Sequence, residues 1–94
     1  MATSIHIYDD NAELRQGLVE LLSLSAEFVV TGSYDNCLRA EIEVKRDPPD
    51  MILMDIDMPG MSGIEAVKKI RQFNRTVHII MLTVFDDNMH ILDA

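Results

Sequence analysis

Short runs of apolar and β-branched residues recur along the chain, and after each run apolar residues return every three or four positions. Runs of the first kind predict buried strands, and the segments that follow predict amphipathic helices. The predicted strands are residues 4–8, 28–32, 51–55 and 77–83. The predicted helices are residues 11–25, 34–46 and 62–73, with a fourth that opens at Asp86. This alternation predicts an α/β fold with a parallel sheet and helices on both faces.

The apolar residues of each predicted helix fall on one side, and we expect that side to pack against the sheet. In the strand at 51–55 the apolar residues are consecutive, which is typical of a central parallel strand buried on both faces. The residues expected to face inward are Leu14, Leu18, Leu21 and Leu22 on the first helix, Leu38 and Ile42 on the second, and Ile64, Val67, Ile70 and Phe73 on the third.

The composition suits one small domain and disfavours several classes of partner. The chain has 94 residues, of which 48% are hydrophobic, enough for a single core. Its net charge of -8 repels phosphate backbones and anionic lipid, so we expect no direct contact of this segment with nucleic acid or membrane, while a cation is favoured. The single Cys37 excludes an internal disulfide, and no signal peptide is visible, so we expect a cytoplasmic protein.

Acidic residues stand where the predicted strands end. Asp9 and Asp10 follow the first strand, Asp55 ends the third, and Thr83 ends the fourth. Because the carboxyl ends of parallel strands meet at one edge of a sheet, we expect these groups to converge there. Two carboxylates roughly 4 Å apart repel by about 4 kcal/mol at an effective dielectric constant of about 20, and a hard divalent cation offsets this repulsion. The pattern therefore predicts a Mg²⁺ site and metal-dependent phosphate chemistry.

Asp55 is the best candidate for a nucleophile at this edge. A carboxylate can attack phosphorus to form an aspartyl phosphate, and the metal then neutralises charge on the transferring group. Asp55 ends a strand that is held by core residues on both faces, which gives the rigid mount that an in-line displacement needs. Thr83, on the neighbouring strand, could hydrogen-bond a phosphoryl oxygen.

The segment "MDIDMPGMSG" (54–63) bends away directly after the strand. Pro59 presets the first central position of a tight turn, and Gly60 tolerates the positive φ of the second. The turn should leave the end of the strand open to solvent. It should also direct the backbone carbonyl of Asp57 toward the metal.

Three blocks in this order, "DD" (9–10), "MDIDMPGMSG" (54–63) and "MLT" (81–83), resemble the receiver domain of bacterial two-component response regulators. The resemblance spans the whole chain and implies a flavodoxin-like doubly wound sheet, with strand order 2-1-3-4-5 when complete. It implies that Asp55 accepts a phosphoryl group from a phosphohistidine of a sensor histidine kinase, and that Thr83 moves toward the phosphate as the switch. The implied Mg²⁺ site consists of Asp10, Asp55 and the carbonyl of Asp57, with Asp9 nearby through water.

The resemblance also implies a signalling domain rather than an enzyme, with at most slow self-dephosphorylation. A DNA-binding output domain that controls transcription would belong to the complete protein. The family places a phosphate-binding lysine at the end of a fifth strand, followed by a fifth helix, whereas this chain reaches its last residue in the predicted fourth helix. Lys68 and Lys69 cannot replace that lysine because they lie on the third helix.

The resemblance therefore leads us to expect that residues 1–94 are a receiver domain that lacks strand five and helix five. In that case the strand at 77–83 would form a bare apolar edge, so we expect the chain to self-associate or to fold only partly, and to respond poorly to a phosphodonor.

Other interpretations of these residues exist. Asp10 followed by Glu13 resembles a helix capping box, so the acidic pair could simply begin a helix. The block at 55–60 half-fits a calcium-binding EF loop, but Ala66 stands where a bidentate Glu is needed. A haloacid-dehalogenase-type phosphatase also uses an Asp-x-Asp pair after a strand, although there the pair follows the first strand. A receiver-like binding module that is never phosphorylated is the remaining alternative.

Overall fold

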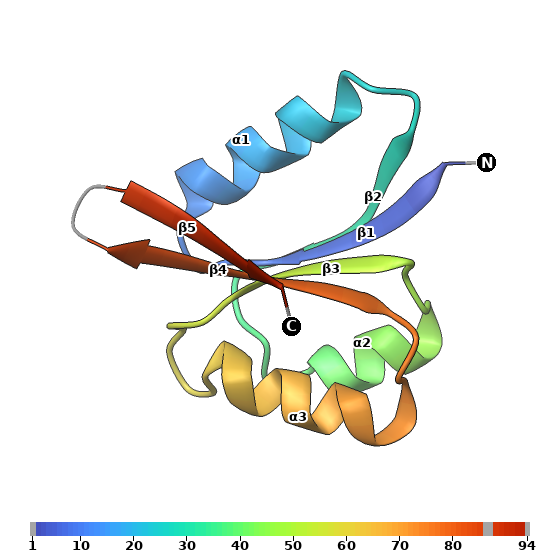
Figure 1. The fold of residues 1–94 in the computed structure, drawn as a ribbon, viewed down its shortest axis with the longest axis vertical. Helices are drawn as coiled ribbons and strands as arrows, with labels where there is room; N and C mark the ends of the chain where they lie inside the picture. Colours follow the sequence, from blue (N-terminus) through green and yellow to red (C-terminus); the bar gives the residue numbers. More distant parts are fainter. Residues whose placement is uncertain (1, 86–87, 94) are drawn as a thin grey trace.

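The computed structural model describes the backbone of residues 2–85 and 88–93 and the side chains of residues 2–82. One five-stranded sheet lies between α1 on one face and α2 and α3 on the other, as Figure 1 shows. The strands are β1 (Thr3–Tyr8), β2 (Phe28–Tyr34), β3 (Met51–Asp55), β4 (His78–Phe85) and β5 (Asn88–Asp93). The helices are α1 (Ala12–Ser23), α2 (Ala40–Arg46) and α3 (Gly63–Phe73). None of the described helices is both long enough and apolar enough to cross a membrane.

Four of the five strands are parallel, in the order β2-β1-β3-β4. This order and the alternation of strands and helices confirm the predicted α/β fold. β3 is central, and its residues are buried on both faces, since Ile52 and Met54 contact one core and Leu53 the other. The bounds of β3 are those that the sequence predicts.

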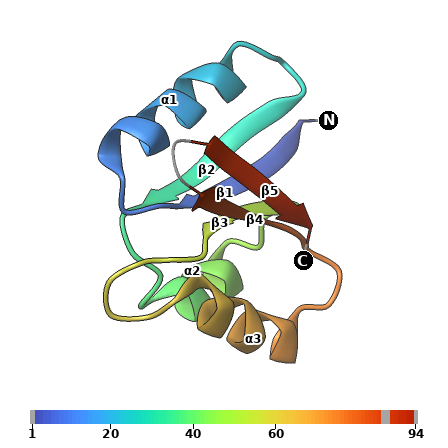
Figure 2. The ribbon, with the colours of Figure 1, turned by 60° about the vertical axis from the view of Figure 1, so that its left-hand side comes forward.

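The predicted fourth helix is wrong over residues 88–93, which form β5 and pair antiparallel with β4. Residues 86 and 87, where that helix was expected to begin, lie outside the described residues. The physical reason is the edge of β4, whose N–H and C=O groups would otherwise lack partners on one side. A short connection allows an antiparallel return, whereas a parallel strand needs a long crossover. In Figure 2 the two strands lie side by side at the edge of the sheet.

This pairing also changes the expectation of self-association. β4 extends to Phe85 and lies between β3 and β5, so it is not the bare edge that the sequence predicts. The reason given for self-association through residues 77–83 is therefore removed. The outer strands of the sheet are β2 and β5 instead.

The two cores lie on opposite faces of the sheet. On the α1 face, Ile5, Ile7, Leu53 and Leu82 are buried, and Leu18 and Leu22 of α1 pack against them in half-buried positions. On the other face, residues of α2 and α3 cover Tyr8, Ile52 and Met54. The α2–α3 face has the larger cluster of fully buried residues, because α1 itself buries none of its residues completely.

Several predicted inward faces are wrong. β2 continues to Tyr34, whose ring stacks on Tyr8 at 5.0 Å between centroids, so α2 starts later than expected and turns a different face inward. Ala40 and Val44 are buried, whereas Leu38 and Ile42 are 56% and 54% exposed. On α1, Leu21 is 64% exposed, and on α3, Ile64 is 49% exposed while Ile70 is buried.

Candidate functional site

The loop after β3 is held tightly against the end of that strand. Ile56 N–H donates to the carbonyl oxygen of Leu82 at 3.1 Å, and Gly63 N–H donates to the carbonyl oxygen of Ile56 at 2.8 Å. Gly60 has φ of 86°, as expected for the second central residue of the turn. A Cβ on Gly63 would collide with the carbonyl oxygen of Asp55, so only glycine fits this position. The chain therefore turns away directly after β3 and returns to the end of that strand, where α3 begins.

Three carboxylates meet where β1 and β3 end. The strands pair up to Tyr8 and Met54, and the next residues are Asp9 and Asp55. Carboxylate oxygens of Asp9, Asp10 and Asp55 all lie within 4.8 Å of one another. Asp9 is buried, Asp55 is half-buried and Asp10 is exposed, so the group opens to solvent on one side. The structure thus brings together three of the residues that the sequence predicts for the site.

Backbone N–H groups orient two of the three carboxylates. Asn11 N–H donates to Oδ1 of Asp9 at 2.8 Å, and Asp57 N–H donates to Oδ1 of Asp55 at 3.3 Å. Asn11 is the residue that caps α1, since its side chain accepts a hydrogen bond from Leu14 N–H. The capping-box interpretation of Asp10 is therefore wrong.

The carboxylates of Asp9 and Asp55 are both harder to ionise than usual. For Asp55, burial is the largest cause of the shift, followed by the charge of Asp9, and Asp10 adds to both. Together these effects raise the pKa of Asp55 to about 6, although the hydrogen bond from Asp57 N–H acts in the opposite direction. Burial also raises the pKa of Asp9, and the neighbouring charge of Asp10 adds to the effect. Repulsion between neighbouring carboxylates, which the sequence predicts, contributes to both shifts, but burial contributes more to each.

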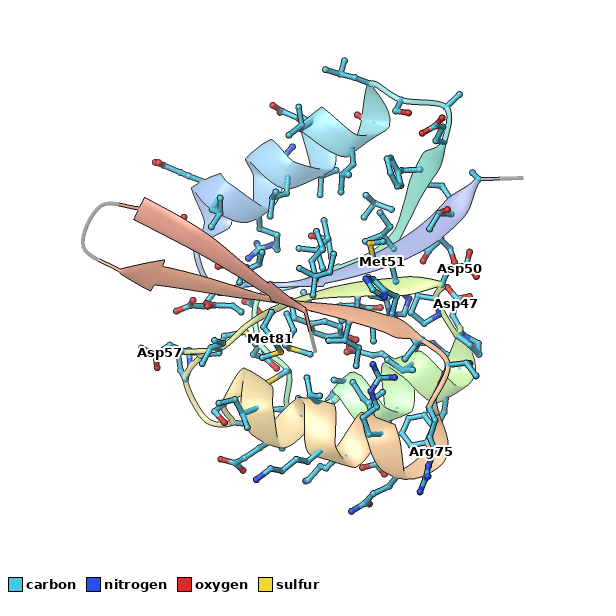
Figure 3. All side chains as sticks on the ribbon, in the orientation of Figure 1. Asp47, Asp50, Met51, Asp57, Arg75 and Met81 are labelled. Atoms are coloured by element: carbon cyan, nitrogen blue, oxygen red, sulfur yellow. The ribbon has the colours of Figure 1, made fainter. Side chains whose placement is uncertain are left out.

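The donor set of this cluster fits Mg²⁺. All three side chains offer carboxylate oxygens, the ligands that hard divalent cations prefer, and the exposed side of the group leaves positions for water or phosphate. The side chain of Asp57 is exposed, and Figure 3 shows it at the end of the sheet opposite to Asp47 and Asp50. The predicted contact of the Asp57 carbonyl with the metal stays a prediction.

Thr83 lies in β4 directly after Leu82, which is the register partner of Asp55. Its backbone is therefore at the same edge of the sheet as the carboxylates, and its role as the switch stays a prediction. Lys68 and Lys69 lie on α3, as expected, and both are exposed.

Two residues near the carboxylates were missed by sequence reasoning. One is Gly63, which begins α3. No turn requires a glycine at this position, so its presence there is the only indication in the sequence that the site is crowded. The other is Arg15, whose Nη1 donates to the carbonyl oxygen of Asp9 at 2.6 Å. Its only signal is a cation on the first helix a few residues after the acidic pair.

Comparison with known proteins identifies the class to which this fold and acidic edge belong. The model of the response regulator receiver domain family matches residues 5–94. The chain therefore belongs to the response regulator receiver domain family.

Individual relatives agree with this assignment. The chain is 38% identical over 91 residues to the uncharacterized transcriptional regulatory protein YhcZ of Bacillus subtilis, a match that covers 96% of this chain and 42% of the relative. It is 35% identical over 94 residues to the chemotaxis protein CheY of Bacillus subtilis, covering 100% of this chain and 78% of CheY. The chain thus spans about two-fifths of the length of YhcZ and most of the length of CheY.

Solved structures share the fold. A DNA-binding response regulator of the LuxR family from Staphylococcus aureus superposes with a TM-score of 0.81 at 34% identity, covering 89% of this chain and 70% of that one. A LuxR-family two-component response regulator from Aurantimonas sp. SI85-9A1 gives a TM-score of 0.83 at 27% identity, covering 92% of this chain and 61% of that one.

Proposed function

We propose that this receiver domain accepts a phosphoryl group on Asp55 from a phosphohistidine of a sensor histidine kinase. The observation that carries the proposal is the position of Asp55 at the end of the central strand, within 4.8 Å of the carboxylate oxygens of Asp9 and Asp10. The proposed metal ligands are Asp9, Asp10, Asp55 and the backbone carbonyl of Asp57. Mg²⁺ bound there would neutralise charge on the transferring phosphoryl group and on its oxygens.

The chain's own residues would prepare Asp55 for the transfer. A carboxylate oxygen of Asp55 forms a bond to phosphorus while the bond from phosphorus to the histidine nitrogen breaks, and the nitrogen leaves with its electron pair. Asp57 N–H holds Oδ1 of Asp55, which favours attack by the other oxygen. β3 carries the carboxylate on a rigid strand, so the attacking atom needs little reorganisation.

Phosphorylation would then act on the loop and on β4. A phosphoryl group adds a charge of about -1.5 to -2 at the strand end. We propose that the hydroxyl of Thr83 bonds this group and thereby switches an output, which in a complete protein of the length of YhcZ would be transcription through a DNA-binding domain. The domain would work in the cytoplasm as a signalling module with at most slow self-dephosphorylation.

Incubation with acetyl phosphate and Mg²⁺ tests the proposal and separates it from the alternatives. One phosphoryl group should be added to the protein and none to Asp55→Asn, while Asp57→Asn should still be labelled.

Repeated hydrolysis of a phosphomonoester would instead indicate a phosphatase, which membership in the receiver family disfavours. Mg²⁺ binding without any phosphoryl uptake would indicate a receiver-like binding module.

A further inference from the structure

Arg15 connects α1 to the acidic cluster through the main chain of Asp9. The side chain of Arg15 is half-buried, and its Nη1 donates to the carbonyl oxygen of Asp9 at 2.6 Å. Hydrogen bonds from a guanidinium are shorter and stronger than those between neutral groups. β1 pairs with both of its neighbours only as far as Tyr8, so the carbonyl of Asp9 lies beyond the ladder and Arg15 gives it a donor.

Asp9 is then held by three hydrogen bonds, one to β2 and two to the first turns of α1 and its capping residue. Its N–H donates to the carbonyl oxygen of Tyr34 at 3.1 Å, its Oδ1 accepts from Asn11 N–H at 2.8 Å, and its carbonyl accepts from Arg15. These bonds fix both the main chain and the rotation of the side chain. Within residues 2–82, whose side chains the structure describes, no donor bonds to the second carboxylate oxygen of Asp9, so this oxygen can bind a ligand at the cluster.

The charge of Arg15 also reaches Asp9, where it lowers the pKa of the carboxyl group against the larger effect of burial. Charge and hydrogen bond have opposite effects on cation binding. A positive charge beside the cluster repels Mg²⁺, so its removal alone would tighten binding. A hydrogen bond that holds Asp9 in place favours binding, so its removal would weaken it.

We propose that Arg15 is a positioning residue of the metal site, which sets the main-chain position of Asp9 and so places its carboxylate beside those of Asp10 and Asp55. The inference rests on the proposed function only in taking Mg²⁺ as the cation. The guanidinium is required for its geometry rather than for its charge. A lysine ammonium carries the same charge but is a compact donor on a stem of different length, so it does not reproduce the hydrogen bond to the carbonyl of Asp9.

Mg²⁺ titrations of the 94-residue chain, followed by the amide chemical shifts of the β1 end, test this directly. Arg15→Met should raise the Kd for Mg²⁺ by about tenfold or more, the usual loss when a residue that orients a metal ligand is removed. Arg75→Met is the matched control, since it removes the same charge from an exposed site that Figure 3 shows far from Asp57. The control should leave the Kd unchanged. Arg15→Lys should also weaken binding, although it keeps the charge.

Each alternative result would overturn the inference. An unchanged or lower Kd for a folded Arg15→Met would show that the residue acts through charge alone or not at all. Full affinity in Arg15→Lys would show that geometry is not needed, and this variant decides the matter if circular dichroism shows that Arg15→Met does not fold. An unmutated chain that binds no Mg²⁺ would contradict this inference and the proposed site together. Mg²⁺ binding that depends on Arg15, without phosphoryl uptake, would support the inference and contradict the proposed function.

Discussion

Replacing Asp55 by Asn should stabilise the folded protein at neutral pH when no divalent cation is present. The carboxylate of Asp55 is half-buried beside Asp9 and Asp10, and this surrounding raises its pKa from the ordinary 3.8 to about 6. Above pH 6 the group is ionised in both the folded and the unfolded chain, so the folded chain bears the cost of the charge. An amide of nearly the same shape removes that cost.

The magnitude follows from the pKa. A change from 3.8 to about 6 corresponds to about 3 kcal/mol. Because Asp55 is half-exposed, solvent screening reduces this to roughly 1 to 1.5 kcal/mol. As the pH falls from about 6 to about 4, the folded state takes up the proton before the unfolded state does, so the aspartate protein gains stability. The difference between the two proteins should therefore shrink over that interval and be nearly absent at pH 4.

Urea unfolding followed by far-UV circular dichroism measures this difference at pH 7.5, 6 and 4 in the presence of EDTA. Asp57→Asn is the control because it removes the same charge from the exposed side of the same loop, and it should change the free energy of unfolding by less than about 0.5 kcal/mol. Saturating Mg²⁺ should cancel or reverse the advantage of Asp55→Asn. If Asp55→Asn in EDTA is no more stable than the unmutated protein at pH 7.5, the argument from crowded carboxylates is refuted.

Three further predictions concern neighbouring residues. Asp10→Ala should raise the Kd for Mg²⁺ more than Asp57→Ala, because residue 57 is proposed to bind through its backbone; equal losses in a Mg²⁺ titration would contradict this. Gly63→Ala should lower the free energy of unfolding in urea by roughly 2 to 3 kcal/mol, because the added Cβ would collide with the carbonyl oxygen of Asp55. Gly17→Ala is the control: a Cβ there meets open space, so the free energy of unfolding should rise slightly. Thr83→Ala should still be phosphorylated but should lose the change in amide shifts along β4; an unaltered change would exclude it as the switch.

The part of the fold that the sequence predicts best is the part set by local pattern alone. Residues 51–55 are consecutive apolar residues that end in an aspartate, and β3 has these bounds. The acidic cluster follows, because neighbouring parallel strands must bring Asp9 and Asp55 to the same edge. A pattern of this kind needs no knowledge of side-chain geometry.

The predictions from sequence are wrong where contacts between residues far apart in the sequence determine the structure. The sequence predicts a helix that includes residues 88–93, but these residues pair with the edge of β4 and form a strand. Tyr34 continues β2 because it stacks on Tyr8, and this delays α2 and leaves Leu38 exposed. The bond from Arg15 to the carbonyl of Asp9 joins a helix to a strand end, and no spacing rule predicts it.

Reduction of the phosphorylated protein with borohydride tests the central claim most directly, because it converts an aspartyl phosphate to homoserine. Peptide mass spectrometry after treatment with acetyl phosphate, Mg²⁺ and borohydride should locate homoserine at residue 55 alone, and Asp55→Asn should yield none. Homoserine at residue 9, 10 or 57 in the unmutated protein, or stable labelling of Asp55→Asn, would contradict the assignment of Asp55 as the phosphoacceptor.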